Sequence, residues 1–199
     1  MAKIPNRDEF LAGVAAYDGN NCVYFEGLVG LQARWGDPPK MADAIWPLLR
    51  NWHADFYRYG SGDPQAITSA IEQNIDSLKA LRSRTIDTLC AADEPAIRTL
   101  FWAFAKATGR TNSKGFQASS VGAVKAMHLL SPGLLPLWDT AISDRYDCDQ
   151  DAFGYIKFCR IMKDFATAVR PYLPIPDDRS ILKRIDEFNY SSVVRHRAP

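Results

Sequence analysis

The chain has 199 residues, of which 47% are hydrophobic, so it is long enough to bury a full hydrophobic core. Its formal net charge of +1 indicates no particular partner. The N-terminal sequence MAKIPNRDEF is polar, and no apolar run approaches about 18 residues, which argues against a signal peptide and against a membrane span. We therefore expect a cytoplasmic protein without membrane contact.

The four cysteines lie far apart in the sequence and form no C-x-x-C pair. This spacing argues against structural disulfides, a zinc site and a cysteine-bound iron–sulfur cluster. We expect no metal and no cofactor, and reduced thiols that pack as small hydrophobic groups. The cysteines are Cys22, Cys90, Cys148 and Cys159.

The first half of the chain shows apolar residues at helical spacing between short breaks rich in Gly, Pro and Asp. Segments 10–15 and 22–34 predict the first two helices. One continuous third helix, ending at Gly60, is predicted by the apolar stripe Ile45, Leu49, Trp52, Phe56 and Tyr59. Asp63-Pro64, a capping residue followed by proline, predicts the next helix, with the stripe Ile67, Ile71, Ile75 and Leu78.

The middle of the chain continues this helical pattern. Asp93-Glu94-Pro95 predicts the start of a helix that closes at Gly109, and residues 110–117, RTNSKGFQ, predict a basic loop. Asp139 is expected to cap a short helix that runs to about Tyr146.

The last part of the chain predicts a long helix stopped by Pro171, a final helix capped by Asp178 and a frayed tail at 195–197. No segment alternates with period two over a useful length. We predict an all-α fold of eight or nine helices. It forms one compact unit over residues 1–199, or two helical lobes that share a cleft near residues 121–142.

The stretch 121–142, VGAVKAMHLLSPGLLPLWDTAI, carries the most chemical information. It predicts an apolar helix whose two polar residues, Lys125 and His128, lie on one face because they are three positions apart. Ser131-Pro132-Gly133 ends this helix, and Asp139 opens the next one. The sequence therefore brings an amine and a carboxylate to the same end of a helical pair.

The distribution of charge favours a phosphate-binding surface around this stretch. Residues 95–138 contain five basic residues and no acidic residue, although the whole chain carries a net charge of only +1. A basic segment in an otherwise mildly acidic protein is typical of a site that faces a phosphate backbone. Chance clustering on a solvated face is the alternative.

The segment from Lys125 to Asp139 resembles the active-site region of the helix-hairpin-helix DNA glycosylase superfamily. It is similar in style to the lysine-bearing 8-oxoguanine glycosylase/lyases and their diverged prokaryotic relatives. In that superfamily a lysine lies on the helix before a proline-containing segment, and an aspartate caps the following helix beside the lesion pocket. Lys125 and Pro136-Leu137-Trp138-Asp139 match this arrangement. The family's Gly-rich hairpin turn corresponds here to the degenerate segment 119–122.

The resemblance implies a monomer that extrudes a damaged or modified base from double-stranded DNA and hydrolyses its N-glycosidic bond. Asp139 is then the carboxylate that stabilises positive charge on the sugar and orients or deprotonates water. Lys125 is the amine that attacks C1′ and forms a Schiff base, which adds strand cleavage. We expect the base and its surroundings to contact Trp138, His128, Tyr57 and Arg58, and DNA phosphates to contact Lys106, Arg110 and Lys114.

Several alternatives remain open at the level of sequence. Asp139 is equally well explained as an N-cap alone, Lys125 as its structural ion-pair partner, and His128 and Trp138 as core residues. Two other functions also fit the residues. One is a glycosidase acting on a free nucleoside or nucleotide, and the other is a non-catalytic helical module that binds DNA or protein.

Overall fold

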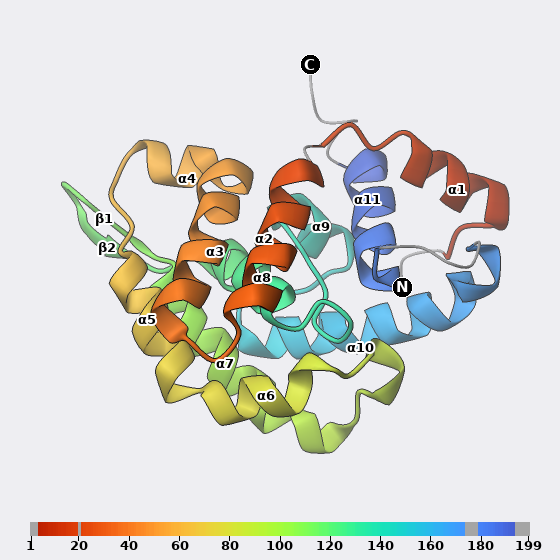
Figure 1. Ribbon diagram of the computed structural model, residues 1–199. Helices are drawn as coiled ribbons and strands as arrows, with labels where there is room; N and C mark the ends of the chain where they lie inside the picture. Colours follow the sequence, from red (N-terminus) through yellow and green to blue (C-terminus); the bar gives the residue numbers. More distant parts are fainter. Residues whose placement is uncertain (1–3, 20, 174–178, 194–199) are drawn as a thin grey trace.

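The computed structural model describes residues 4–19, 21–173 and 179–193, in which the chain is mostly helical (Figure 1). The predicted cap at Asp178 and the tail at 195–197 lie outside these residues. The α-helices are α1 (Arg7–Ala15), α2 (Asn21–Arg34), α3 (Pro38–Trp52), α4 (Ala54–Arg58), α5 (Pro64–Gln73), α6 (Ile75–Arg82), α7 (Glu94–Ala107), α8 (Ser120–Leu130), α9 (Thr140–Arg145), α10 (Ala152–Val169) and α11 (Ile181–Val193). The strands are β1 (Arg110–Asn112) and β2 (Gly115–Gln117).

Local sequence signals account for many helix starts. The side chain of Asp63 accepts a hydrogen bond from the amide of Gln65 at the start of α5, where Pro64 occupies the first helical position as predicted. Ser119 caps α8 and Asp139 caps α9 in the same way. The all-α class and the caps expected at Asp63 and Asp139 are therefore confirmed.

Two helices predicted as continuous are each broken. The third helix ends at Trp52, and α4 starts only after His53, whose backbone (φ −135°, ψ 34°) is not helical. The amides of Phe56 and Tyr57 bond to the carbonyl of His53, so the carbonyl of Trp52 is not used within α4. A second break, at Asn74, separates α5 from α6. Apolar periodicity missed both breaks because the spacing of the apolar residues continues across them in the sequence. In α4 that spacing does not correspond to burial, since the helix has no buried residue and Tyr59 is 67% exposed.

The basic loop predicted at 110–117 is an antiparallel hairpin, which corrects the expectation that the chain lacks strands. Thr111 pairs with Phe116, and Gly115 takes a φ of +107° that suits glycine at the turn. Ser61 bridges to Thr111 on the outer side of β1. Two three-residue strands are too short to show a sequence period, which is why the pattern gave no signal.

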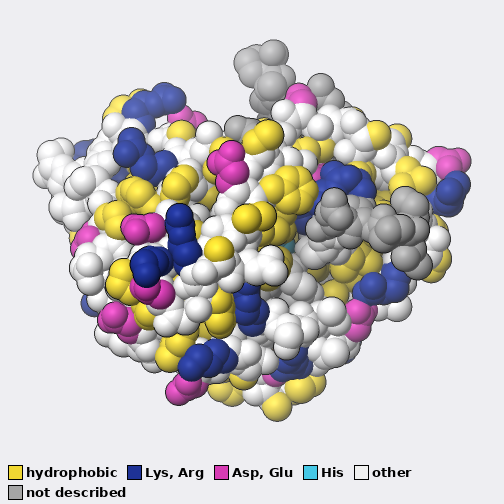
Figure 2. Space-filling view, in the orientation of Figure 1, with side chains coloured by type: hydrophobic (Ala, Val, Ile, Leu, Met, Phe, Trp, Pro, Cys, Tyr) yellow, Lys and Arg dark blue, Asp and Glu magenta, His cyan; other side chains and the backbone are white. Residues whose placement is uncertain are grey.

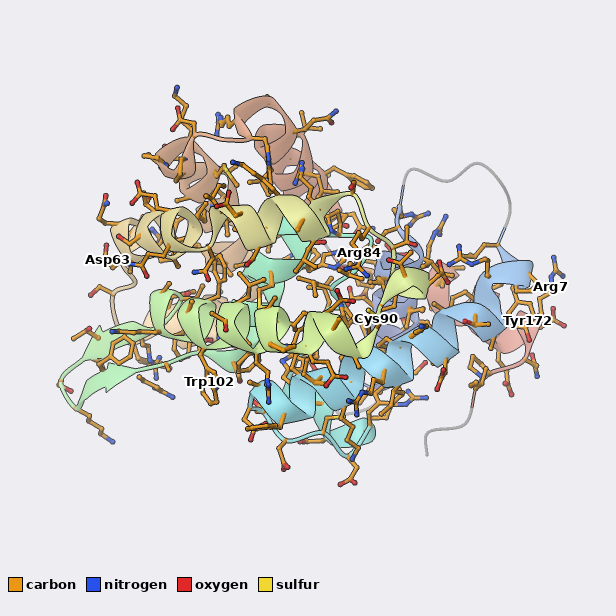
Figure 3. The ribbon with its side chains drawn as sticks, turned by 90° about the horizontal axis from the view of Figure 1, so that it is seen from below. Arg7, Asp63, Arg84, Cys90, Trp102 and Tyr172 are labelled. Carbon is orange, nitrogen blue, oxygen red and sulfur yellow. The ribbon has the colours of Figure 1, made fainter. Side chains whose placement is uncertain are left out.

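Helix α8 lies at the centre of the molecule. Every side chain from position 121 to 130 is buried, and α7, α2 and α3 pack around it. Helix α10 lies beneath, against α7, while α1 and α11 pack together at one end (Figure 1). The view from below shows Trp102 pointing outward from α7 (Figure 3), where it is 55% exposed. The apolar helix expected at the start of the stretch 121–142 is thus at the core of the fold.

The cysteine expectation holds only in part. Cys148 and Cys159 are buried free thiols, but Cys22 and Cys90 are exposed, because they lie in the first turn of α2 and in the link before α7. Among the described helices, none combines the length and apolar character needed to cross a membrane.

Candidate active site

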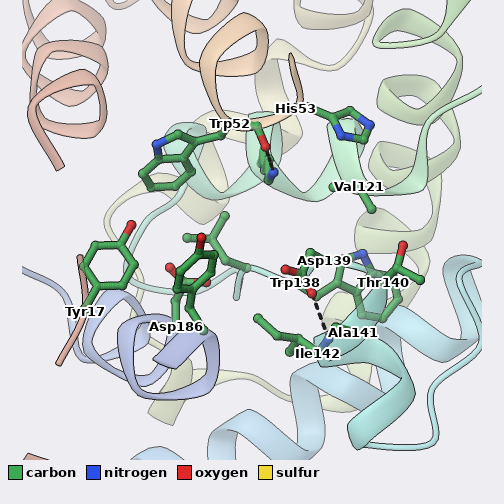
Figure 4. A pocket seen from close by; sticks show the side chains of 13 residues that line it. Tyr17, Trp52, His53, Val121, Trp138, Asp139, Thr140, Ala141, Ile142 and Asp186 are labelled. Carbon is green, nitrogen blue, oxygen red and sulfur yellow. Dashed lines mark hydrogen bonds between the residues drawn. The ribbon is translucent and has the colours of Figure 1, made fainter. Parts of the chain in front are cut away.

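A cavity of about 380 Å³ opens where α8, the start of α9, the α3–α4 junction and α11 meet (Figure 4). Lys125 and Asp139, the two residues expected to carry the chemistry, both line it. The remaining lining residues are Tyr17, Trp52, His53, Val121, Leu137, Trp138, Thr140, Ala141, Ile142, Asp186 and Tyr190. The cavity is therefore built from segments at both ends and the middle of the chain.

Lys125 reaches the cavity from the buried helix α8 and is 9% exposed. Its ammonium donates a hydrogen bond to the backbone carbonyl of Trp52, shown as a dashed line in Figure 4. This carbonyl is available because α3 stops at Trp52 and the next helix bonds to His53 instead. The helix break that periodicity missed thus provides the lysine with its backbone partner.

Burial lowers the pKa of Lys125 to about 8, and the nearby carboxylates of Asp139 and Asp186 only partly oppose this effect. The sequence left open which influence dominates, and the structure gives the answer. With a pKa near 8, a sizeable fraction of the amine is neutral at physiological pH, and the neutral amine is the nucleophilic form.

Asp139 occupies the N-cap of α9, where its Oδ1 accepts a hydrogen bond from the amide of Ile142 at 2.8 Å. Burial raises the pKa of this carboxyl group, against the lowering effects of that amide and of Lys125. Lys125 bonds to the carbonyl of Trp52 and Asp139 to the amide of Ile142, and no ion pair joins the two side chains in the described structure. The explanation of Lys125 as the ion-pair partner of Asp139 therefore lacks its contact. A carboxylate has about four acceptor positions, so a capped Asp139 keeps capacity for a ligand.

His53 lines the cavity but was not among the residues predicted to do so. Its Nε2 lies 2.9 Å from the hydroxyl of Ser119, and its ring stacks on Phe56 at 4.6 Å. Burial lowers the pKa of His53 to about 3, with further contributions from Lys125 and Arg110. His53 is therefore a neutral hydrogen-bonding group at the rim, and its position at the helix break gave no periodic signal.

His128 lies three residues beyond Lys125 on α8 but faces a closed environment. Its Nδ1 donates to the carbonyl of Leu135 at 2.6 Å, which leaves Nε2 to accept from the hydroxyl of Tyr24 at 3.0 Å. Its side chain is fully buried, and burial lowers its pKa to about 4. Both ring nitrogens are used inside the protein, so this geometry is that of a core histidine.

Trp138 lies in the aromatic core and is 1% exposed. Its ring packs edge-on against Phe101 and Tyr155, and Phe158 lies 5.3 Å away. A base that stacked on this indole would have to displace these core rings. Trp52, which stacks in parallel on Tyr24 at 5.7 Å and lines the cavity, offers an aromatic wall there instead.

Tyr57 and Arg58, predicted to contact the substrate, lie on α4 outside the cavity lining. The hydroxyl of Tyr57 donates to the carbonyl of Thr108 at 2.7 Å, which ties α4 to the end of α7. Arg58 pairs with Asp55 at 2.7 Å on the surface. In this conformation Tyr57 anchors α4 to α7, and Arg58 lies on the surface of α4.

The basic residues predicted to contact phosphate lie along α7 and the hairpin. Lys106 and Lys114 are exposed, whereas Arg110 is held over the ring of Phe56 at 4.5 Å and bonds to Gln117. Figure 2 shows the face on which α2 and α3 lie in front, where acidic and basic side chains are interspersed and several basic ones gather over α4. Because Arg110 influences the pKa of His53, its charge acts at the cavity rim.

Tyr17, Asp186 and Tyr190 complete the cavity from the ends of the chain and were not predicted. Tyr17 follows α1, and the other two lie on α11. Only tertiary packing of α11 beside α9 brings them close to residues 125–139, and no short-range spacing encodes that packing.

Comparison of the chain with protein families, with curated proteins and with solved structures gave no match.

Proposed function

We propose that this protein is a DNA glycosylase that excises a damaged or modified base by breaking its N-glycosidic bond. The observation that supports this proposal is a single cavity lined by a buried lysine with a pKa of about 8 and by a rigidly capped aspartate. These two groups match the nucleophile and the charge-stabilising carboxylate that the reaction needs.

Asp139 acts on the sugar in this mechanism. Loss of the base leaves positive charge on the sugar at C1′, and a carboxylate held beside that carbon stabilises the charge. The same group orients the attacking water and takes its proton, a role that the raised pKa of Asp139 favours. The capping hydrogen bond to Ile142 keeps the carboxylate in place throughout.

Lys125 adds a second route. Its neutral amine attacks C1′, a C–N bond forms, and the bond from C1′ to the base breaks with its electron pair leaving on the base. Loss of a proton from the amine and opening of the sugar ring then give a Schiff base. The carbonyl of Trp52 orients the amine for this attack.

A cavity of about 380 Å³ is large enough to take a single base and part of its sugar, so the base must leave the duplex to reach it. Extrusion costs a few kcal/mol and is least costly for damaged or mispaired bases, which favours repair or defence substrates. The hairpin, with Lys114 near its turn and Arg110 at its base, and the C-terminal turn of α7 with Lys106 are the surfaces we assign to the phosphate backbone.

The test is mass spectrometry of free bases released from DNAs that carry oxidised, alkylated, deaminated or glycosylated bases. We expect release of at least one base by the wild type and loss of that release in Asp139→Asn. Release from free nucleosides, with no affinity for duplex DNA, would assign the cavity to a nucleoside or nucleotide glycosidase instead. Absence of release from every substrate by folded protein would contradict the proposal.

A further inference from the structure

A second carboxylate, Asp186, lines the same cavity from α11. Figure 4 places Asp186 beside Tyr17 on one side of the cavity, with Asp139 and Thr140 on the other. Asp186 is close enough to influence the pKa values of both Lys125 and Asp139. Neither step of the glycosidic chemistry described above uses it, so its presence needs a separate explanation.

Lys183 holds Asp186 in place. Its Nζ lies 3.0 Å from Oδ2 of Asp186, and the lysine side chain is completely buried. The same ammonium lies over the rings of Tyr17 at 4.3 Å and Trp52 at 5.1 Å. An ammonium enclosed by aromatic rings and a carboxylate has little freedom to move, so it fixes the direction of the Asp186 carboxylate.

The neighbouring Glu187 has its own partners. Arg179 donates to both oxygens of Glu187 at 3.1 Å, and the side-chain amide of Asn21 donates to one of them at 3.0 Å. Lys183 lies 3.6 Å from Glu187, which is further than its 3.0 Å distance from Asp186. Lys183 is therefore committed mainly to Oδ2 of Asp186. The side chain of Asp186 is 13% exposed, toward the cavity that it lines.

On this side of the cavity the carboxylate of Asp186, a hydrogen-bond acceptor, lies next to the aromatic side chains of Tyr17 and Trp52. A carboxylate accepts hydrogen bonds and donates none, so it preferentially binds a ligand that presents N–H groups. Tyr17 and Trp52 line the cavity and supply aromatic surface beside Asp186 against which a planar heterocycle can pack. Lys125 provides a donor on another wall, which suits an oxygen or ring nitrogen of the same ligand.

We propose that Asp186 is a specificity-determining residue that accepts a hydrogen bond from an exocyclic amino group, so that the cavity selects amino-substituted heterocyclic bases. Lys183 is its positioning residue. This assignment rests on the proposed glycosylase function, because it names the class of base that the site removes. It differs from that function in being measurable by binding alone.

The test compares the binding of adenine, 2-aminopurine and unsubstituted purine to the full chain by ligand-observed NMR titration. We expect at least one amino-substituted base to bind about tenfold more tightly than purine, because it adds a hydrogen bond to a charged group. Asp186→Asn should reduce this preference to less than twofold. Asp139→Asn should keep the preference even where it abolishes base release, which separates failure of the base assignment from failure of the catalytic one.

Two controls keep the test decisive. Asp43→Asn removes an exposed carboxylate from α3 and should leave the preference unchanged. If Asp186→Asn leaves Lys183 with only the more distant carboxylate of Glu187 and unfolds the chain, the double variant Lys183→Met, Asp186→Asn removes both charges together and should show the same loss of preference. Equal affinity for all three purines, no binding of any of them, or a preference that survives the loss of Asp186 would overturn the assignment.

Discussion

Lys125 and His128 lie one turn apart on the same buried helix, and burial lowers the pKa of both, yet their surroundings differ. His128 has both ring nitrogens bonded to Leu135 and Tyr24 in a closed part of the core. Lys125 has one backbone acceptor and otherwise borders a cavity with two carboxylates. A lowered pKa is therefore common to both residues, and it is the position beside an open cavity that makes Lys125 the better candidate for chemistry.

The largest expected difference between the two residues is in covalent chemistry. Borohydride should trap the wild type on DNA that contains an abasic site, and Lys125→Gln should reduce trapping to background because the nucleophilic amine is gone. His128→Gln, which keeps a polar side chain, should still be trapped. Denaturing gel electrophoresis of the complexes measures both. A Lys125→Gln variant that is trapped as well as the wild type would remove the lysine from the reaction.

For the free energy of unfolding we expect the opposite order, with a larger effect from replacing His128 than from replacing Lys125. His128→Leu leaves the hydroxyl of Tyr24 and the carbonyl of Leu135 unpaired in the core and should lower the free energy of unfolding by about 3 kcal/mol. Lys125→Met should be at least as stable as the wild type at pH 7. The fall in the pKa of Lys125 from 10.5 to about 8 corresponds to a penalty of roughly 3 kcal/mol for its buried charge. Urea unfolding measures both values.

The same comparison predicts how stability depends on pH. Because the pKa of Lys125 is lower in the folded state, its contribution to the free energy of unfolding rises from about pH 8 to pH 10.5, and Lys125→Met should lack this rise. The lowered pKa of His128 gives a contribution that is present above pH 6.5 and lost as the pH falls toward 4. The assignment would be contradicted if Lys125→Met kept the rise between pH 8 and pH 10.5, or if His128→Leu kept the loss of stability between pH 6.5 and pH 4.

A smaller effect is expected on the rate of trapping. The neutral fraction of an amine with a pKa of about 8 rises by about tenfold between pH 7 and pH 9 and changes little above that. The initial trapping rate should follow this curve. A rate that keeps rising by tenfold per unit through pH 10 would show that the lysine has an ordinary pKa in the complex.

The smallest effect concerns the surface rather than the cavity. Lys106→Gln and Lys114→Gln should each reduce the slope of log affinity against log salt concentration by about one, because each removes a phosphate contact. Fluorescence anisotropy with duplex DNA over a series of salt concentrations measures the slope. Lys79→Gln, on α6, is the matched control and should leave it unchanged. Unchanged slopes in all three variants would take α7 and the hairpin out of the interface.

Much of the fold follows from the sequence, because helical stripes and capping residues act over a few positions. The apolar helix that carries Lys125 and the cap at Asp139 were predicted on this basis, and both are present. The break at His53 was missed, because it does not change the apolar period. Asp186 was missed for another reason: it reaches the cavity through packing between helices about fifty residues apart in the chain.

The most direct test of the central claim compares two capping aspartates. Asp151 caps α10 by accepting from the amides of Phe153 and Gly154, as Asp139 caps α9, but it does not line the cavity. Release of a modified base from DNA should fall by about 100-fold or more in Asp139→Asn and stay near the wild-type rate in Asp151→Asn. Equal rates in both variants would show that Asp139 is only a helix cap, and the cavity would no longer be the site of glycosidic cleavage.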